Sequence, residues 1–102
     1  MGEALITHSV IFRLKHLAGS VAERDFLGDA RILGAIPGVQ NFRRLRQVSP
    51  KNDYRFGFAM EFADQEAYAG YDGHPAHIAF VRDRWLPEVE AFLEIDYEDL
   101  PP

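Results

Sequence analysis

Residues 5–15, Leu-Ile-Thr-His-Ser-Val-Ile-Phe-Arg-Leu-Lys, alternate with a period of two. One parity is strongly apolar, with Ile6, Val10 and Phe12 in it, and His8 stands among them. Successive side chains of a strand point to opposite faces, so this pattern predicts a strand with one buried face. The imidazole of His8 is therefore expected on the buried face of the sheet.

A helix is predicted after this strand. Ser20 and Glu23 have the S-x-x-E spacing of a capping box, in which both side chains satisfy free backbone N–H groups of the first turn. Apolar residues then recur at helical spacing over residues 26–36. Pro37 and Gly38 end the pattern, because a residue before proline is pushed out of the helical backbone region.

Two more strands are predicted over residues 39–48 and 54–62. The first is mostly polar, which indicates a position at the edge of the sheet. Residues 49–53, Ser-Pro-Lys-Asn-Asp, have the composition of a turn that joins antiparallel neighbours. In the second strand four large apolar residues share one parity, and they are Phe56, Phe58, Met60 and Phe62.

Two short helical pieces and a last strand complete the chain. Asp64 is a candidate helix cap, and the dipeptide His74-Pro75 restarts the helix, since proline suits the first helical position. The helical pattern is broken or kinked at Leu86-Pro87. Residues 91–98 alternate again and predict the final strand.

The resulting order is β-α-β-β-α-β. It predicts an α+β, ferredoxin-like fold with one four-stranded antiparallel sheet and helices on one face. A chain of 102 residues leaves no element to cover the other face of the sheet. We therefore expect a homodimer in which two sheets pack against each other.

Composition excludes several classes of protein. The formal net charge is −5, so nucleic acid is not an expected partner, and the absence of cysteine excludes disulfides and thiolate chemistry. Residues 1–5 lack the basic and apolar regions of a secretory signal. No stretch has the roughly 20 apolar residues that a membrane span requires. We expect a soluble cytoplasmic protein without a membrane partner.

Charge is distributed unevenly along the sequence. A basic group surrounds the second predicted strand, whereas the chain after Arg84 has carboxylates and no basic residue. Complementary charge predicts that the two segments lie close together, within one subunit or across the dimer interface. The basic residues are Arg43, Arg44, Arg46, Lys51 and Arg55.

Several motifs together resemble the stress-responsive α/β barrel (Dabb) family. The resemblance covers nearly the whole chain and identifies residues 1–102 as a single Dabb domain. It implies a dimeric α+β barrel, in which two four-stranded sheets form the barrel and the helices lie outside. The motifs are Thr-His-Ser-Val-Ile-Phe at 7–12, Ile-Pro-Gly-Val at 36–39, Tyr-Asp-Gly-His-Pro-Ala-His at 71–77, and the closing segment from Trp85-Leu86-Pro87 through Phe92 to Asp96-Tyr97.

The resemblance also implies catalytic residues. Plant polyketide cyclases of this family carry a tyrosine before the His-Pro-Ala-His element, and by position their catalytic tyrosine and histidine fall on Tyr71 and His77. His8 matches their first-strand histidine. A neutral imidazole of this set would remove a proton beside a carbonyl while the phenol stabilises the enolate. A further pocket histidine of the cyclases falls on Phe56, so the specific cyclase reaction is not implied.

These residues predict a cavity between sheet and helices that binds a small hydrophobic or aromatic carbonyl compound, with cyclase- or lyase-type chemistry. No cofactor is expected. The residues expected to line the cavity beside His8, Tyr71 and His77 are Ile6, Phe56, Phe58, His74 and Val81.

Two alternatives stay open. In the first, His8 and His77 are core histidines of a non-catalytic, stress-responsive oligomer. In the second, His74 and His77, three residues apart, hold a metal ion together with His8, although no zinc-protease motif accompanies them. Haem is conceivable in a barrel of this kind, but no residue pattern in the sequence selects for it.

Overall fold

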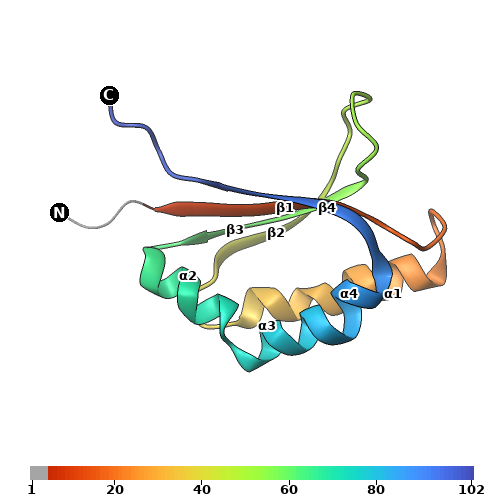
Figure 1. Ribbon diagram of the computed structural model, residues 1–102, viewed down its shortest axis with the longest axis horizontal. Coiled ribbons are helices and arrows are strands. Elements are labelled where there is room, and N and C mark those ends of the chain that lie inside the picture. The colour runs from red at the N-terminus through yellow and green to blue at the C-terminus, as the bar shows by residue number, and fades with distance from the viewer. Residues whose placement is uncertain (1–4) are drawn as a thin grey trace.

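The computed structural model describes residues 5–102 and has two layers, a four-stranded antiparallel sheet and helices on one of its faces (Figure 1). Most of the segment on which the secretory-signal argument rests, residues 1–4, lies outside the described residues. None of the helices in the described part of the chain is long and apolar enough to cross a membrane.

All four predicted strands are present, and the sheet order is β2-β3-β1-β4. The second strand is at an edge, as its polarity predicted, and the last strand occupies the other edge. Strand ends differ from the predicted ends by at most two residues. The strands are β1 (Ile6–Leu14), β2 (Gln40–Arg46), β3 (Phe56–Phe62) and β4 (Val89–Tyr97).

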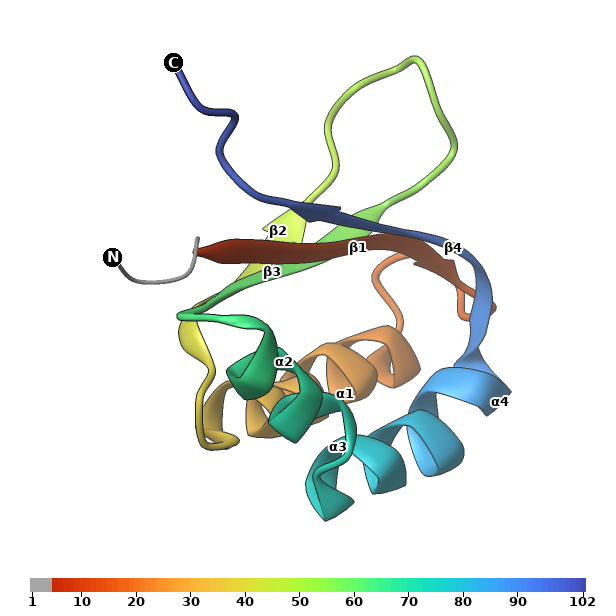
Figure 2. The same ribbon diagram turned by 60° about the vertical axis from the view of Figure 1, so that its left-hand side comes forward.

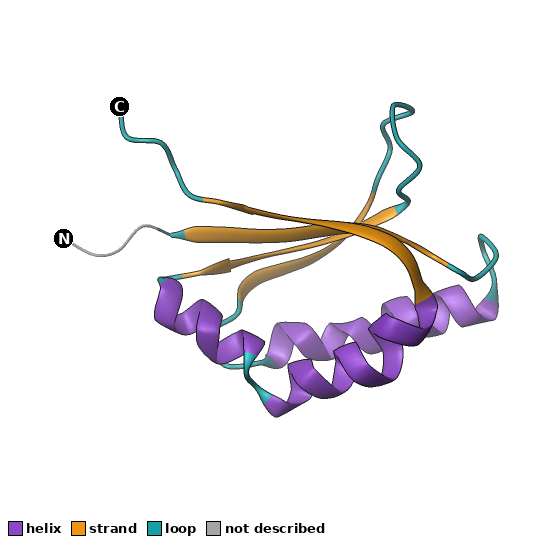
Figure 3. Ribbon diagram, viewed as in Figure 1, coloured by secondary structure: helices purple, strands orange, loops and turns teal. Residues whose placement is uncertain are grey.

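The helical layer consists of six short segments, shown in purple in Figure 3. Three are regular helices predicted from caps or prolines, and three are irregular or very short. The segments are α1 (Val21–Asp29), the 3₁₀ helix η1 (Ala30–Ala35), α2 (Gln65–Asp72), α3 (Pro75–Phe80), the π-helix η2 (Val81–Trp85) and α4 (Leu86–Glu88).

The single helix predicted through Ile36 is correct only in its first half. From Ala30 the backbone tightens into η1, which packs closely on β2. A Cβ atom on Gly34 would lie 2.9 Å from Cδ2 of Phe42, so this contact requires glycine. Apolar spacing does not distinguish an α-helix that ends in a 3₁₀ segment from one that continues. At the other predicted break, Pro87 lies in α4, which follows η2 directly, and the helical run ends one residue later at Glu88.

The helix caps follow the sequence pattern. Ser20 Oγ accepts a hydrogen bond from the N–H of Glu23 at 3.1 Å, and the carboxylate of Glu23 accepts one from the N–H of Gly19 at 3.0 Å. Asp64 caps α2 in the same way, through the N–H of Ala67 at 2.8 Å. These caps fix where the helices begin relative to the sheet.

The two faces of the sheet differ in what covers them. On the helical side, Phe12, Phe58 and Phe62 are buried and form the centre of an aromatic core. The opposite face carries the other parity of each strand, and the described part of the chain places no helix over it (Figure 2). Its apolar side chains are Ile11, Leu45, Leu93, Ile95 and Tyr97.

The basic and acidic segments do not meet within one protomer, so that form of the prediction is wrong. They lie on β2 and β4, at opposite edges of the sheet. Among residues 5–102, no ion pair joins Arg43, Arg44 or Arg46 to a carboxylate. The guanidinium of Arg44 instead donates to the carbonyl oxygen of Leu27 at 2.8 Å. A contact across a dimer interface stays a prediction.

Candidate active site

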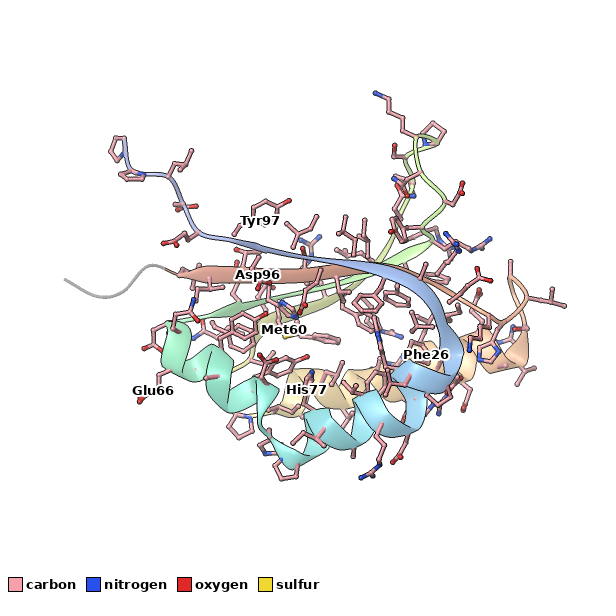
Figure 4. All side chains as sticks on the ribbon, viewed as in Figure 1. Phe26, Met60, Glu66, His77, Asp96 and Tyr97 are labelled. Atoms are coloured by element: carbon pink, nitrogen blue, oxygen red, sulfur yellow. The ribbon has the colours of Figure 1, made fainter. Side chains whose placement is uncertain are left out.

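A cavity of about 360 Å³ lies between the sheet and the helices. In Figure 4, Met60 marks its sheet side and His77 its helical side. Five of the residues predicted from the sequence line it, namely His8, Phe58, Tyr71, His77 and Val81. The three catalytic candidates therefore share one cavity.

Three predicted residues do not line this cavity. Ile6 and Phe56 are buried on the correct face of the sheet, but each lies two residues along its strand from a lining residue, roughly 7 Å away. His74 caps α3, because its Nδ1 accepts a hydrogen bond from the N–H of Ala76 at 3.0 Å. Its imidazole is thus engaged in holding the helix start.

His8 is held by a hydrogen-bonded triad. The register of β1 and β4 places it opposite Asp96, and its Nδ1 lies 2.6 Å from Oδ1 of that carboxylate. The hydroxyl of Tyr68, on α2, donates to Oδ2 of Asp96 at 2.8 Å and lies 2.9 Å from Nδ1. An ionised carboxylate only accepts hydrogen bonds, so we assign the hydrogen of the ring to Nδ1.

This assignment leaves Nε2 of a neutral His8 as an acceptor. Nε2 lies 3.8 Å from Oε2 of Glu94, which also lines the cavity. The side chain of His8 is only 6% exposed, so its few polar contacts determine its orientation. A buried ring with one fixed N–H and one free lone pair is suited to accept a proton.

His77 is oriented on the opposite wall. Its Nδ1 lies 3.0 Å from the backbone carbonyl oxygen of Asp72, which can only accept, so Nδ1 carries the hydrogen here as well. The ring of Tyr71 lies between the two histidines, with centroids 4.5 Å from His77 and 6.1 Å from His8. Two imidazoles and one phenol therefore converge on one volume.

Both tyrosines near the histidines are kept neutral. Burial raises the pKa of Tyr71 well above its usual range, and the nearby carboxylates of Asp72 and Glu94 raise it further. Burial also raises the pKa of Tyr68, as does its hydrogen bond to Asp96. A neutral phenol is a hydrogen-bond donor, so Tyr71 is suited to stabilise a developing negative charge on an oxygen atom.

The rest of the cavity is apolar and largely aromatic. Trp85 comes from η2 and packs edge-on against Phe92 of β4, with ring centroids 5.5 Å apart. Segments of π-helix are often found at functional sites, and this one supplies two lining residues. The other apolar lining residues are Val10, Leu33, Phe58, Met60, Phe80, Val81 and Leu86. The cavity thus has one polar and one apolar part.

His8, His74 and His77, the possible metal ligands predicted from the sequence, do not form a common group of ligand atoms among residues 5–102. Nδ1 of His74 and Nδ1 of His77 both make hydrogen bonds to the backbone. In the described part of the chain, His8, Glu94 and Asp96 form a different group, whose possible ligand atoms lie within 4.8 Å of one another. In this structure His8 and Asp96 form hydrogen bonds with each other and with Tyr68.

The partners of His8 are not evident from the sequence. Glu94 and Asp96 belong to the carboxylate-rich segment after Arg84, and Tyr68 belongs to the helical piece that follows Asp64. Period two shows that Glu94 and Asp96 share a face, but not that this face meets the helices. Only the register of β1 against β4, with His8 opposite Asp96, reveals the pair.

The sheet order, with helices on one face, defines a ferredoxin-like α+β fold. The family model of the stress responsive A/B barrel domain (Dabb) matches residues 6–99. The chain belongs to the Dabb family. No protein of curated function matches the sequence.

Solved structures agree with this assignment. A Dabb family protein with a ferredoxin-like fold from Mesorhizobium loti is 61% identical, with a TM-score of 0.96 over 97% of this chain and all of the other. A dimeric ferredoxin-like protein of unknown function from Thermobifida fusca is 17% identical, with a TM-score of 0.78 over 95% of this chain and 92% of the other. A hydroxynitrile lyase from Passiflora edulis is 12% identical, with a TM-score of 0.82 over 97% of this chain and 96% of the other. The last two share the fold with this chain.

The neutral phenols predict an unusual alkaline titration. Tyr68 and Tyr71 should remain protonated at about pH 11, one unit above the ordinary pKa of tyrosine. Tyr68→Phe and Tyr71→Phe should therefore leave the rise in tyrosinate absorbance between about pH 9 and pH 11 unchanged. Each of the 4 tyrosines contributes roughly a quarter of the full absorbance change. A loss of that size between about pH 9 and pH 11 in either variant would contradict the assignment. Circular dichroism at the same pH provides the control for folding.

Proposed function

We propose that this Dabb protein binds a small hydrophobic or aromatic carbonyl compound in the cavity and transfers a proton on it. The observation that supports this most strongly is the convergence of His8, Tyr71 and His77 on one largely apolar volume. A ligand with an aryl or alkyl body and one carbonyl group matches both parts of the wall. The body would pack against Trp85 and Phe92, and the carbonyl would face Tyr71.

The proposed step is removal of a proton from the carbon beside the carbonyl. Nε2 of His77, free in the neutral ring, takes the proton, and the electron pair of the broken C–H bond moves to the carbonyl oxygen as an enolate forms. The hydroxyl of Tyr71 donates a hydrogen bond to that oxygen. In a cyclase the enolate carbon then attacks a second carbonyl, and the alkoxide that forms takes the proton from Nε2 of His77. In simple exchange that proton, or one from solvent, returns to the carbon. Nε2 of His8, oriented by Asp96, accepts a second proton where the reaction releases one.

A non-catalytic oligomer is the main alternative, and the polar part of the cavity argues against it. In a purely structural protein, buried histidines and tyrosines need only have hydrogen-bond partners for their polar atoms. Here Asp96 and Tyr68 satisfy one nitrogen of His8 and leave the other facing Glu94 at 3.8 Å. A divalent cation on His8, Glu94 and Asp96 is a second candidate function. Chelator treatment distinguishes it, because proton transfer by side chains does not depend on a metal.

We further propose that the protein is a homodimer with the two sheets facing each other. The face of the sheet opposite the helices is apolar and partly exposed, with Leu93 at 47% and Tyr97 at 57%. Contiguous apolar patches of this kind mark interaction surfaces. The dimeric ferredoxin-like protein from Thermobifida fusca supports a dimer for this fold.

Two substitutions test the catalytic proposal. The readout is exchange of α-hydrogens for deuterium in an aryl methyl ketone such as acetophenone, followed by proton NMR in D₂O. Tyr71→Phe should slow the exchange by roughly 10²-fold and His77→Ala by roughly 10²- to 10⁴-fold, the usual effects of losing an oxyanion donor and a general base.

Tyr54→Phe is the matched control, because Tyr54 does not line this cavity, and it should exchange at the wild-type rate. A wild-type protein that binds the ketone and exchanges no hydrogen would reject catalysis. Full exchange in both cavity variants would reject the assigned residues.

Sedimentation tests the dimer. We expect a species of twice the 11.6 kDa chain mass at micromolar concentration, since an isolated protomer leaves its apolar sheet face in water. A folded monomer at that concentration would contradict face-to-face packing.

A further inference from the structure

Two arms of the chain rise from the helix-free face of the sheet. One is the connection between β2 and β3, and the other is the segment that follows β4 to the C-terminus (Figure 1). In Figure 2 both arms again lie on the side opposite the helices. They border the face that a second copy of the chain would cover.

The arms have opposite charge. In the basic arm, Lys51 and Arg55 outnumber the single carboxylate, Asp53. Arg43, on the helix-free face of the adjacent strand β2, adds to this positive charge. The acidic arm carries Glu98 and Asp99. All these side chains belong to exposed residues. Within residues 5–102 none of them takes part in an ion pair, although other exposed charges such as Arg13 and Glu90 do. Both arms are thus free to bind a partner of opposite charge.

The arms cannot neutralise each other within one protomer. The basic arm belongs to the β2 edge of the sheet and the acidic arm to the β4 edge, with β3 and β1 between them. A second copy offers both charges at once. In a two-fold dimer every contact occurs twice, so one orientation can pair both basic arms with both acidic arms.

We propose that the basic arm of one protomer clasps the acidic arm of its partner across the dimer interface. This inference rests on the homodimer proposed above and specifies its orientation. Packing of the apolar faces alone does not select one orientation of two sheets. Stacking basic arm on basic arm would be repulsive, whereas basic on acidic is attractive, so the charges select the orientation.

Exposed ion pairs of this type are screened by salt and contribute more to specificity than to affinity. Burial of the apolar sheet face would supply most of the free energy of dimer association. A polyanion in solution is the competing partner of the basic arm, and the heparin-binding measurement described below detects it.

Zero-length cross-linking tests the clasp in the unmodified protein. Carbodiimide joins a lysine amine to a nearby carboxylate, and the chain has only two lysines, Lys15 and Lys51. We expect an amide between Lys51 and Glu98 or Asp99, formed between a ¹⁵N-labelled and an unlabelled chain and identified by mass spectrometry. Lys51→Arg keeps the charge and should lose this cross-link while remaining dimeric.

Charge reversal supplies the second test. One chain carries Arg43→Glu, Lys51→Glu and Arg55→Glu, and the other carries Glu98→Lys and Asp99→Lys. Each alone should dimerise at least tenfold more weakly at low salt, and a mixture should form the heterodimer, in which both contacts are restored.

The outcomes separate the two proposals. A monomeric wild-type protein would overturn the homodimer. A wild-type dimer without the Lys51 cross-link, or variants that dimerise as well as wild type, would overturn the clasp and leave the homodimer standing. If the chain with Arg43→Glu, Lys51→Glu and Arg55→Glu lost heparin binding while its dimerisation was unchanged, the basic arm would be assigned to a polyanion and the clasp would be overturned.

Discussion

The burial of His8 in the apolar face of β1 is the constraint on which the site depends. A histidine that is 5% exposed among phenylalanines needs polar partners, since an unsatisfied buried polar group is costly. Asp96 from the adjacent strand and Tyr68 from α2 supply them, at 2.6 and 2.9 Å from Nδ1. One ring thereby links β1, β4 and the helical layer, and its second nitrogen lies 3.8 Å from the carboxylate of Glu94.

The same strand alternation produces the two surfaces of the molecule. One parity builds the aromatic core and the polar end of the cavity beneath it. The other parity leaves an apolar sheet face without a helix, in keeping with the dimeric relatives of this fold. The cavity wall includes Phe92 and Glu94 of β4, the strand that precedes the acidic arm. The proposed ligand site and the proposed dimer contact therefore share this edge of the sheet.

The sequence predicted the architecture well because its signals are local. Alternation in β1, the Ser20 and Asp64 caps and the polarity of β2 each depend on residues close together in the chain. The position of Tyr71 and His77 in one cavity with His8 followed from the family resemblance. The partners of His8 could not be predicted, because pairing Asp96 with a residue 88 positions away depends on strand register. Likewise, the 3₁₀ segment depends on the contact of Gly34 with Phe42.

The state of the His8 ring tests the central claim most directly. Long-range ¹H–¹⁵N NMR on the histidine rings reports which nitrogen carries hydrogen, and His8→Gln assigns the signals. At about pH 9, where a free imidazole is neutral, the hydrogen bond to Asp96 predicts a hydrogen on Nδ1 of His8. An Nδ1 without hydrogen would contradict the account, because the lone pair available for chemistry would then face Asp96 instead of the cavity.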